Sequence, residues 1–426
     1  MPFNRVEIKP KELAPYKPLI GNALYSQIRK KAQKLAGLRV AVLNATAAGG
    51  GVVELFLSLI PLLNDVGVKT SWYTLTAPEE FFEITKKIHN LLQGQKGSLT
   101  EKEKEFYLEQ NRHFATALAE VETDIWIVHD PQPAALILHS DFRPMIWHCH
   151  LDTSSSGQKI WDFFSFIKNY DKYIFSLKEY ANSHLNTTKT CIFPPAIDPL
   201  SPKNWPIDPF LADSYLATLG VDPARPIITQ ISRFDPWKDP LGVIQSYRLA
   251  KKELPGLQLI LTGEMAADDP EGVRIFGEVQ EAAGCDPDIY LWADNKRSDL
   301  KINAIQVASD VILQKSLKEG FGLTVTEAMW KGKVIVGGNC GGIRLQIKDG
   351  VNGFLVDSPR QASERVIWVL KNPQKAKEIG RRAKDSVRRK FLMPRLLDDY
   401  LSLLTEALPQ ILTSFPSASH LRLELE

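Results

Sequence analysis

A short apolar run and two glutamates mark one stretch of the sequence, Ser309-Asp-Val-Ile-Leu-Gln314 followed by Glu319-Gly-Phe-Gly-Leu-Thr-Val-Thr-Glu327. The apolar run predicts a buried strand and the residues after Gly322 predict a helix, which places Glu319 in a strand-to-helix loop. Gly320 and Gly322 allow a ligand to approach the backbone closely, and the N–H groups at a helix start attract anions and hydroxyls. A helix N-terminus whose acidic residues simply suit the helix dipole explains the spacing equally well.

The whole sequence has the composition of a globular protein with more than one domain. It contains 426 residues, of which 44% are hydrophobic and 24% are charged. A net charge of +2 offers no general reason to bind nucleic acid or an anionic membrane, so neither partner is expected. The N-terminus lacks a signal-peptide pattern, no apolar run approaches the length of a membrane span, and the four cysteines lack metal-ligand spacing. We therefore expect a cytoplasmic protein with reduced thiols.

Short apolar runs alternate with amphipathic segments, which predicts βαβ units and mainly parallel sheets. The expected strands form two series, 39–44, 68–73, 124–129, 144–149 and 172–176, then 226–231, 257–262, 289–292, 311–313 and 334–336. A turn and one further strand are expected within 348–356. Between the series, six prolines from Pro194 to Pro209 oppose helix and sheet alike and predict an interdomain linker. Two doubly wound domains of this kind bind ligands at the carboxyl ends of their strands, in the cleft between them.

Two charged segments have no role that the sequence assigns. Residues 79–122 are polar and predict helices added to the first domain. Residues 375–395 are rich in lysine and arginine, and we interpret them as the solvated face of a helix.

A glycine run, Ala48-Gly-Gly-Gly-Val52, follows the first expected strand and opens the first long helix. Gly50 and Gly51 would let the backbone pass close to a ligand, with the helix N-terminus pointing at it. The run is neither a dinucleotide fingerprint nor a Walker loop, and a tight structural turn explains it about as well.

Two cations follow the first strand of the second series, in Ser232-Arg-Phe-Asp-Pro-Trp-Lys-Asp239. Arg233 and Lys238 would lie in the loop at the carboxyl end of that strand, where ligands bind in such sheets. Two cations can neutralise a diphosphate leaving group as its charge develops. The alternative is a pair of ordinary surface cations, which we consider the weaker interpretation.

Histidines and aspartates follow two strands of the first series, in His129-Asp-Pro-Gln-Pro133 and His148-Cys-His-Leu-Asp152. A carboxylate hydrogen-bonded to an imidazole, such as Asp130 with His150, could bind sugar hydroxyls. A zinc site is the competing interpretation. We disfavour it because His148 and His150 should alternate along an extended strand and point to opposite faces. His148 could also be an ordinary core histidine.

In their order along the chain, these motifs resemble those of the retaining GT-B glycosyltransferases with the two-glutamate E-x7-E pattern. Two further stretches, Val128-His-Asp-Pro-Gln-Pro133 and Pro194-Pro-Ala-Ile-Asp-Pro-Leu200, are similar to the trehalose-synthase branch of that family. The likeness extends from about Leu38 to Leu404. It implies two Rossmann-like, doubly wound α/β domains facing a deep interdomain cleft. Residues 1–198 would form the N-terminal acceptor-side domain, with a C-terminal helix at about 391–426 packed back on it, and residues 199–390 the C-terminal domain that binds the nucleotide sugar.

The resemblance also implies roles for the candidate residues. Arg233 and Lys238 would hold the diphosphate, and Glu327 the ribose. Glu319 would bind hydroxyls of the donor sugar. The other implied contacts are the backbone N–H groups of Gly320, Phe321, Gly322 and Leu323, the phosphate loop at Gly50 and Gly51, and Asp130 and His150 near the transferred sugar.

The implied reaction is reversible transfer of glucose from a nucleoside diphosphate glucose to free glucose, which yields α,α-trehalose. No carboxylate is an obvious covalent nucleophile, so the resemblance favours front-face retention, with a leaving phosphate oxygen taking the acceptor's proton. No cofactor and no protein metal site are required, although Mg²⁺ could accompany the diphosphate. The partners are small-molecule sugars and sugar nucleotides, and a homodimer is one option for the oligomeric state.

Three alternatives remain open at this point. A retaining trehalose phosphorylase would use the same fold with phosphate in place of the nucleotide. A related glucosyltransferase would use another small acceptor. A catalytically inactive sugar-nucleotide sensor would bind the donor without turning it over.

Overall fold

The computed structural model describes residues 2–183, 185–264, 270–294 and 298–414. The chain forms two compact units, one with the described residues up to Pro195 and from Met393 onward, the other comprising Ala196–Leu392. Each unit is a Rossmann-like α/β domain built on a largely parallel sheet, which confirms the predicted fold class. Beyond Ser414, the predicted C-terminal helix lies outside the described residues. Within the described ranges, no helix is both long and apolar enough to cross a bilayer.

The first unit contains a seven-stranded sheet in the order β1-β3-β2-β4-β5-β6-β7. Its strands are β1 Phe3–Arg5, β2 Arg39–Asn44, β3 Lys69–Leu75, β4 Ile125–His129, β5 Met145–Cys149, β6 Lys172–Phe175 and β7 Thr190–Ile192. All neighbours pair in parallel except β1, which is antiparallel to β3. The sequence did not predict β1 and β7, because three residues are too few to show a strand period.

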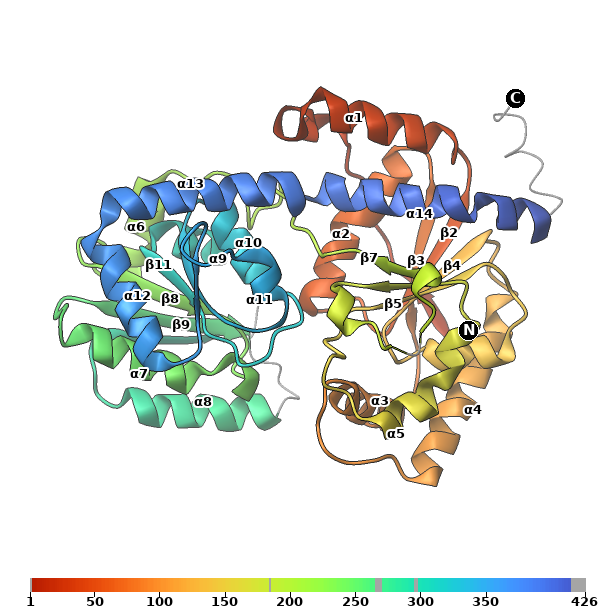
Figure 1. Ribbon diagram of the computed structural model, residues 1–426, viewed down its shortest axis with the longest axis horizontal. Helices are drawn as coiled ribbons and strands as arrows, with labels where there is room; N and C mark the ends of the chain where they lie inside the picture. Colours follow the sequence, from red (N-terminus) through yellow and green to blue (C-terminus); the bar gives the residue numbers. More distant parts are fainter. Residues whose placement is uncertain (1, 184, 265–269, 295–297, 415–426) are drawn as a thin grey trace. The chain divides into compact units, whose positions relative to one another are not determined.

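The helices of the first unit fall into two groups (Figure 1). The first group is α1 Lys17–Gln33, α2 Gly50–Asp65 and α14 Met393–Ser414, in which α14 lies against both α1 and α2. The second group is α3 Glu79–Leu92, α4 Glu101–Leu118 and α5 Gln158–Phe163, in which α3 lies against α4 and α5. Helix α14 therefore returns to the first unit after the chain has built the second.

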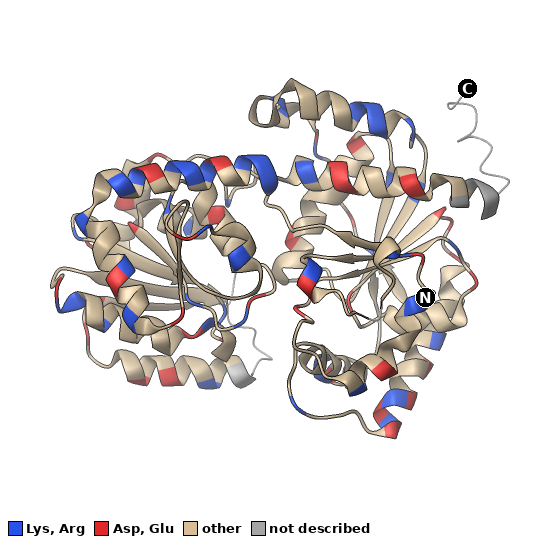
Figure 2. Cartoon of the chain, viewed as in Figure 1, with Lys and Arg blue, Asp and Glu red and all other residues tan. Residues whose placement is uncertain are grey.

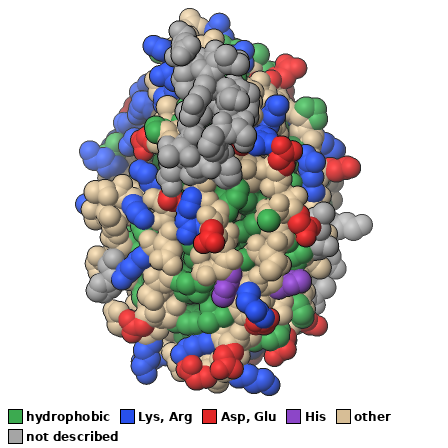
Figure 3. Space-filling model, turned by 90° about the vertical axis from the view of Figure 1, so that its right-hand side faces the viewer, with side chains coloured by type: hydrophobic (Ala, Val, Ile, Leu, Met, Phe, Trp, Pro, Cys, Tyr) green, Lys and Arg blue, Asp and Glu red, His purple; other side chains and the backbone are tan. Residues whose placement is uncertain are grey.

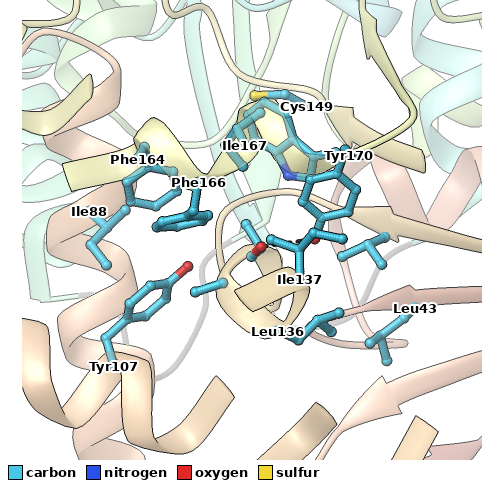
Figure 4. Close-up of a cluster of buried hydrophobic side chains, with 14 of the residues drawn as sticks. Leu43, Ile88, Tyr107, Leu136, Ile137, Cys149, Phe164, Phe166, Ile167 and Tyr170 are labelled. Carbon is cyan, nitrogen blue, oxygen red and sulfur yellow. Dashed lines mark hydrogen bonds between the residues drawn. The ribbon is translucent and has the colours of Figure 1, made fainter. Parts of the chain in front are cut away.

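Helices α3 and α4, which the sequence left without a role, complete the core of the first unit. They bury Phe81, Tyr107 and Phe114 against the sheet. Figure 4 shows Tyr107 among the aromatic side chains of this cluster, with Phe164, Phe166 and Tyr170 nearby. The prediction of helices was correct. These helices are, however, part of the core of the domain, because they cover one face of its sheet.

The second unit contains a six-stranded parallel sheet in the order β10-β9-β8-β11-β12-β13. Its strands are β8 Ile227–Ile231, β9 Gln258–Glu264, β10 Ile289–Asp294, β11 Val311–Gln314, β12 Val334–Gly338 and β13 Phe354–Val356. One apolar cluster joins the sheet to α7 Pro240–Lys251, α8 Pro270–Ala283 and α12 Pro359–Lys371. Another joins it to α6 Pro209–Thr218 and α9 Asp299–Ala308. The remaining helices are α10 Leu323–Trp330, α11 Gly341–Gln346 and α13 Pro373–Lys390.

Most of the basic residues predicted on a solvated helix face lie on α13, but Arg395 belongs to α14, where it is largely buried and pairs with Asp399. Helix α13 buries Ile379, Ala383 and Val387 and leaves most of its lysines and arginines exposed. Figure 2 shows acidic residues among the basic ones along the same helix. On the face drawn in Figure 3, side chains of both signs are likewise interspersed. This distribution agrees with the small net charge of +2.

The proline-rich segment, predicted to be a linker, is built into the second unit from Ala196 onward. Asn303 of α9 donates hydrogen bonds to the carbonyls of Pro202 at 2.9 Å and Trp205 at 3.0 Å. Asn204 donates to the carbonyl of Asp198 at 3.0 Å. The prolines prevent regular structure here, but tertiary hydrogen bonds hold the segment in one path.

Candidate active site

The candidate residues of the second unit follow β8 and β11, the two neighbouring strands at the centre of its sheet, next to β12. Parallel strands bring their carboxyl ends to one edge, so the loops after Ile231, Gln314 and Gly338 meet there. Gln230 shows the connection directly. Its side chain donates to the carbonyl of Lys238 at 2.9 Å and accepts from the backbone N–H of Lys315 at 3.0 Å.

Lys238 and Glu319, assigned to different parts of the donor, contact each other. The Lys238 Nζ lies 2.6 Å from Glu319 Oε2, and the two side chains are 17% and 9% exposed. The same oxygen accepts from Ser316 Oγ at 3.2 Å and Gln314 Nε2 at 3.4 Å. The carboxylate therefore has several donors around it and holds the ammonium group in one place.

Arg233 lies in the same loop but outside this network. Its side chain is 58% exposed, and its guanidinium pairs with Asp235 at 3.1 Å. An exposed ion pair of this kind is weak, so the guanidinium can exchange partners at little cost.

The loop from Glu319 to Leu323 has the conformation that its glycines suggested. Gly322 has a φ of 84°, in the left-handed region, and precedes the first residue of α10. Gln346 donates to the carbonyl of Phe321 at 2.7 Å, and a Cβ on Gly342 would lie 2.3 Å from the Cα of Phe321. The loop is thus clamped from the α11 side, and only glycine fits at position 342.

Glu327 lies on α10, as predicted, but it is only 1% exposed. Its Oε1 lies 2.9 Å from Lys203 Nζ, and its Oε2 accepts from Gln306 Nε2 at 3.2 Å. Burial opposes ionisation of this carboxyl, yet the nearby ammonium groups of Lys203 and Lys331 bring its pKa below the ordinary value. Its contact with a ribose stays a prediction.

Sequence reasoning missed two lysines at this site. Lys315, 4% exposed at the end of β11, pairs with Asp239, which caps α7 with a φ of 48°. Lys203 lies in the proline-rich segment. The position of Lys315 directly after a strand was a usable signal, whereas nothing local marked Lys203.

In the first unit, the glycine loop follows β2 and opens α2. Gly49 and Gly50 have φ values of 69° and 77°, which explains why these positions are glycine. A Cβ at either position would meet no atom within 4 Å, so crowding is not the reason. Both the turn and the ligand loop remain compatible with this geometry.

Asp130 and His150 are in contact, but through the backbone of His150 and not through its imidazole as expected. Asp130 has a φ of 63°, and its Oδ1 accepts from the backbone N–H of His150 at 2.9 Å. Its carbonyl accepts from the indole of Trp147 at 2.9 Å. Below this loop, Tyr107 of α4 donates to the carbonyl of Pro131 at 2.6 Å. Helix α4 thus supports the loop that carries Asp130.

The argument against zinc from strand alternation was wrong. The rings of His148 and His150 stack with centroids 3.9 Å apart, because β5 ends at Cys149 and the chain turns there. With His129, they form a group whose potential metal-ligand atoms lie within 4.8 Å of one another. The planes of the three rings are inclined by 11° to 38° to one another. His129 Nδ1 and His150 Nε2 already face each other in a hydrogen bond, so a metal ion bound by both would have to displace that contact.

Their surroundings favour the neutral form of all three histidines. Burial lowers the pKa of each one, and for His150 it outweighs the attraction of Asp130. His129 Nδ1 lies 2.9 Å from His150 Nε2, and His129 Nε2 has no hydrogen-bond partner among the described residues. We assign the proton of His129 to Nδ1, because a buried unpaired N–H is the rarer arrangement. His150 then carries its proton on Nδ1 and can donate it.

His148 fits the description of a core histidine. It is 3% exposed, and its Nδ1 lies 2.8 Å from the hydroxyl of Tyr400 on α14. Tyr400 follows it by 252 positions in the sequence, which explains why no sequence pattern indicated the contact.

Comparisons with known proteins agree with this arrangement. A family model described as the N-terminal domain of trehalose synthase matches residues 42–182, and the model of group 1 glycosyl transferases matches residues 214–386. The chain is 45% identical over 398 residues to a trehalose synthase of Pyrococcus horikoshii, a match covering 92% of this chain and 96% of that one. It is 28% identical over 397 residues to a trehalose phosphorylase of Pleurotus pulmonarius, covering 81% of this chain and 54% of that one.

Among solved structures, the trehalose-6-phosphate synthase OtsA matches with a TM-score of 0.69 at 14% identity, covering 86% of this chain and 99% of that one. At that identity the likeness concerns the fold alone, and it is to a GT-B glycosyltransferase. The sequence identity and coverage of the Pyrococcus relative establish more. The chain belongs to the trehalose synthase family of glycosyltransferases.

Proposed function

We propose that this glycosyltransferase moves glucose reversibly from a nucleoside diphosphate glucose to free glucose, with retention, to form α,α-trehalose. The observation that carries the proposal is the 2.6 Å pair of Lys238 and Glu319 at the carboxyl edge of the second sheet. It sets a cation for a diphosphate beside an acceptor for sugar hydroxyls, which is the pairing that a sugar nucleotide requires.

Lys238 and Arg233 stabilise the diphosphate as negative charge develops on it. Lys238 is already held by Glu319, so it needs little reorganisation, whereas Arg233 exchanges Asp235 for a phosphate. The backbone N–H groups at the start of α10 add donors on the same side.

Glu319 and Glu327 act as acceptors and not as an acid–base pair. Glu319 binds hydroxyls of the donor sugar, and Glu327 binds the ribose. The bond from the anomeric carbon to the diphosphate breaks as the acceptor oxygen bonds to the same face, and the departing phosphate oxygen takes the acceptor's proton.

The first unit contributes an imidazole and a carboxylate, which suit uncharged hydroxyls as donor and acceptor. His150 donates through Nδ1, and Asp130 accepts, while the backbone hydrogen bond between them keeps both in place. A Cβ at Gly50 would meet no atom within 4 Å, so this position leaves room for a phosphate to approach the start of α2, where Gly51 follows. Within the described ranges, the histidine group is the sole cluster of three or more possible metal ligands. A Mg²⁺ accompanying the diphosphate would therefore be held mainly by the phosphates.

The proposal is tested by supplying trehalose with uridine, adenosine or guanosine diphosphate, or with inorganic phosphate, and following glucose release. Glucose released with a nucleoside diphosphate, together with formation of the nucleoside diphosphate glucose, supports the proposal. Release with phosphate alone would instead identify a trehalose phosphorylase, the activity named for the Pleurotus relative. Testing glucose, glycerol and sugar phosphates as acceptors then decides whether glucose is the preferred one.

A further inference from the structure

The path of the segment from Asp198 to Trp205 brings a lysine to a buried carboxylate. Asn303 holds the segment on the α9 side through the carbonyls of Pro202 and Trp205. On the α10 side, Lys331 Nζ donates to the side chain of Asn204 at 3.1 Å. Lys203 lies between these hydrogen-bonded residues, so the position of its backbone is fixed.

From that position the Lys203 ammonium reaches Glu327. The Nζ to Oε1 distance is 2.9 Å, and the side chains are 12% and 1% exposed. Three polar groups lie near the carboxylate: Lys203 of the proline-rich segment, Gln306 of α9, and Lys331, which directly follows α10. A carboxylate buried to this degree would take up a proton if no cation stood beside it.

The contacts to Lys203 and Gln306 leave acceptor capacity on Glu327. An ionised carboxylate offers about four lone-pair directions. Gln306 uses one of them on Oε2, while Oε1 pairs with the Lys203 ammonium but makes no hydrogen bond among the described residues. At least one direction therefore remains on each oxygen. That number suits a vicinal diol, whose two hydroxyls can each donate one hydrogen bond.

We propose that Lys203 is a positioning residue for the nucleotide, holding Glu327 ionised and oriented to accept both hydroxyls of the ribose. The inference rests on the proposed function, since it requires a nucleotide donor. It assigns the proline-rich segment a part in donor recognition that its sequence does not suggest. A purely structural ion pair would stabilise the unit without affecting how nucleotide binding depends on pH.

The experiment measures calorimetric binding of uridine and adenosine diphosphate to the full chain between about pH 6 and pH 8.5. The variants are Lys203→Met, Lys203→Arg, Glu327→Gln and the double variant Lys203→Met with Glu327→Gln. Circular dichroism melts establish that each variant is folded. If Lys203→Met does not fold, Lys203→Gln replaces it with the same expectation, because it too lacks the charge.

We expect Lys203→Met to weaken binding about tenfold near neutral pH, the size of one lost charge-assisted contact. Its affinity should rise with pH, because Glu327 must then ionise without the ammonium of Lys203 and with Lys331 alone. Lys203→Arg should stay within about twofold of wild type. Glu327→Gln should bind weakly at every pH, and the double variant should bind no more weakly than Glu327→Gln.

Equal binding by wild type and Lys203→Met at every pH would overturn the inference. A second result would also overturn it. If Lys203→Met weakens binding equally at every pH, and the double variant shows the sum of the two single losses in binding free energy, the role of Lys203 is structural. If the wild-type chain binds no nucleoside diphosphate, the proposed function itself fails. That result is distinct, because it appears before any variant is compared.

Discussion

The two sheets present different kinds of side chain at the carboxyl ends of their strands. In the second unit the groups are charged and already paired, as in Lys238 with Glu319, and Lys203 of the proline-rich segment pairs likewise with Glu327. In the first unit they are mainly histidines, buried and held by hydrogen bonds at His129 and His148, with the Asp130 carboxylate beside them. Paired charges stay ionised when buried and can share a partner with a charged ligand. Neutral donors and acceptors suit sugar hydroxyls. In the proposed function, the second unit therefore binds the diphosphate, and the first unit contacts the sugar.

The largest effect should come from breaking the charged pair. Lys238→Ala removes the cation and leaves Glu319, 9% exposed, without that partner. We expect turnover to fall by about 1,000-fold, the upper range for one lost transition-state donor. Steady-state kinetics at saturating donor measure this fall, and a melting curve checks that the variant is folded. A loss below about tenfold would remove Lys238 from the diphosphate site.

Removing the exposed cation should cost less. Arg233→Ala is expected to lower turnover by roughly 100-fold or more, because the guanidinium acts only once negative charge develops on the leaving group. The matched control is Arg388→Ala, an exposed arginine on α13 that should leave turnover unchanged. Near-wild-type turnover in Arg233→Ala would contradict the assigned chemistry.

Acid should lower the stability of the folded chain through the buried histidines of the first unit. Burial keeps the pKa of His129 and His148 below the ordinary value in the folded chain, so the unfolded chain binds more protons on acidification. Stability should therefore fall as pH drops below about 6.5, by up to about 1.4 kcal/mol per histidine for each pH unit. Urea unfolding midpoints at a series of pH values measure this slope.

The contribution of one histidine can be isolated by difference. His148→Phe should be less stable at neutral pH, because it loses the hydrogen bond to Tyr400, yet its stability should depend less steeply on acid. His113→Asn, at an exposed position on α4, should keep the wild-type slope. Identical slopes for wild type and His148→Phe would mean that this histidine is not held neutral by burial.

The smallest expected effect concerns the support that α4 gives to the loop containing Asp130. Tyr107→Phe removes the donor to the carbonyl of Pro131 and should lower the free energy of unfolding by about 1 kcal/mol. The partly exposed Tyr215→Phe is the control and should have little effect. Equal stability of the two variants would show that the hydrogen bond does not hold the loop.

Much of the fold could be predicted because its signals are local. The eleven expected strands, including the one within 348–356, all correspond to strands of the two sheets, since each shows an apolar run near turn residues. The strand-end loops located Lys238, Glu319 and Asp130 at the correct edges for the same reason. Strands β1 and β7 were not predicted, because their own composition does not favour a strand. They form strands because they pair with β3 and β6, respectively.

Local sequence patterns were enough to assign the fold class, the strand ends and the types of residue that stand there, because periodicity and turn chemistry depend on near neighbours. Which of these residues meet depends on how the strands and helices pack. Strand order places β8 beside β11 and so joins Lys238 to Glu319, and the return of α14 joins Tyr400 to His148. The turn after Cys149 stacks His150 on His148, against the alternation of a straight strand. Such contacts depend on the packing of segments far apart in the chain, which no local pattern encodes.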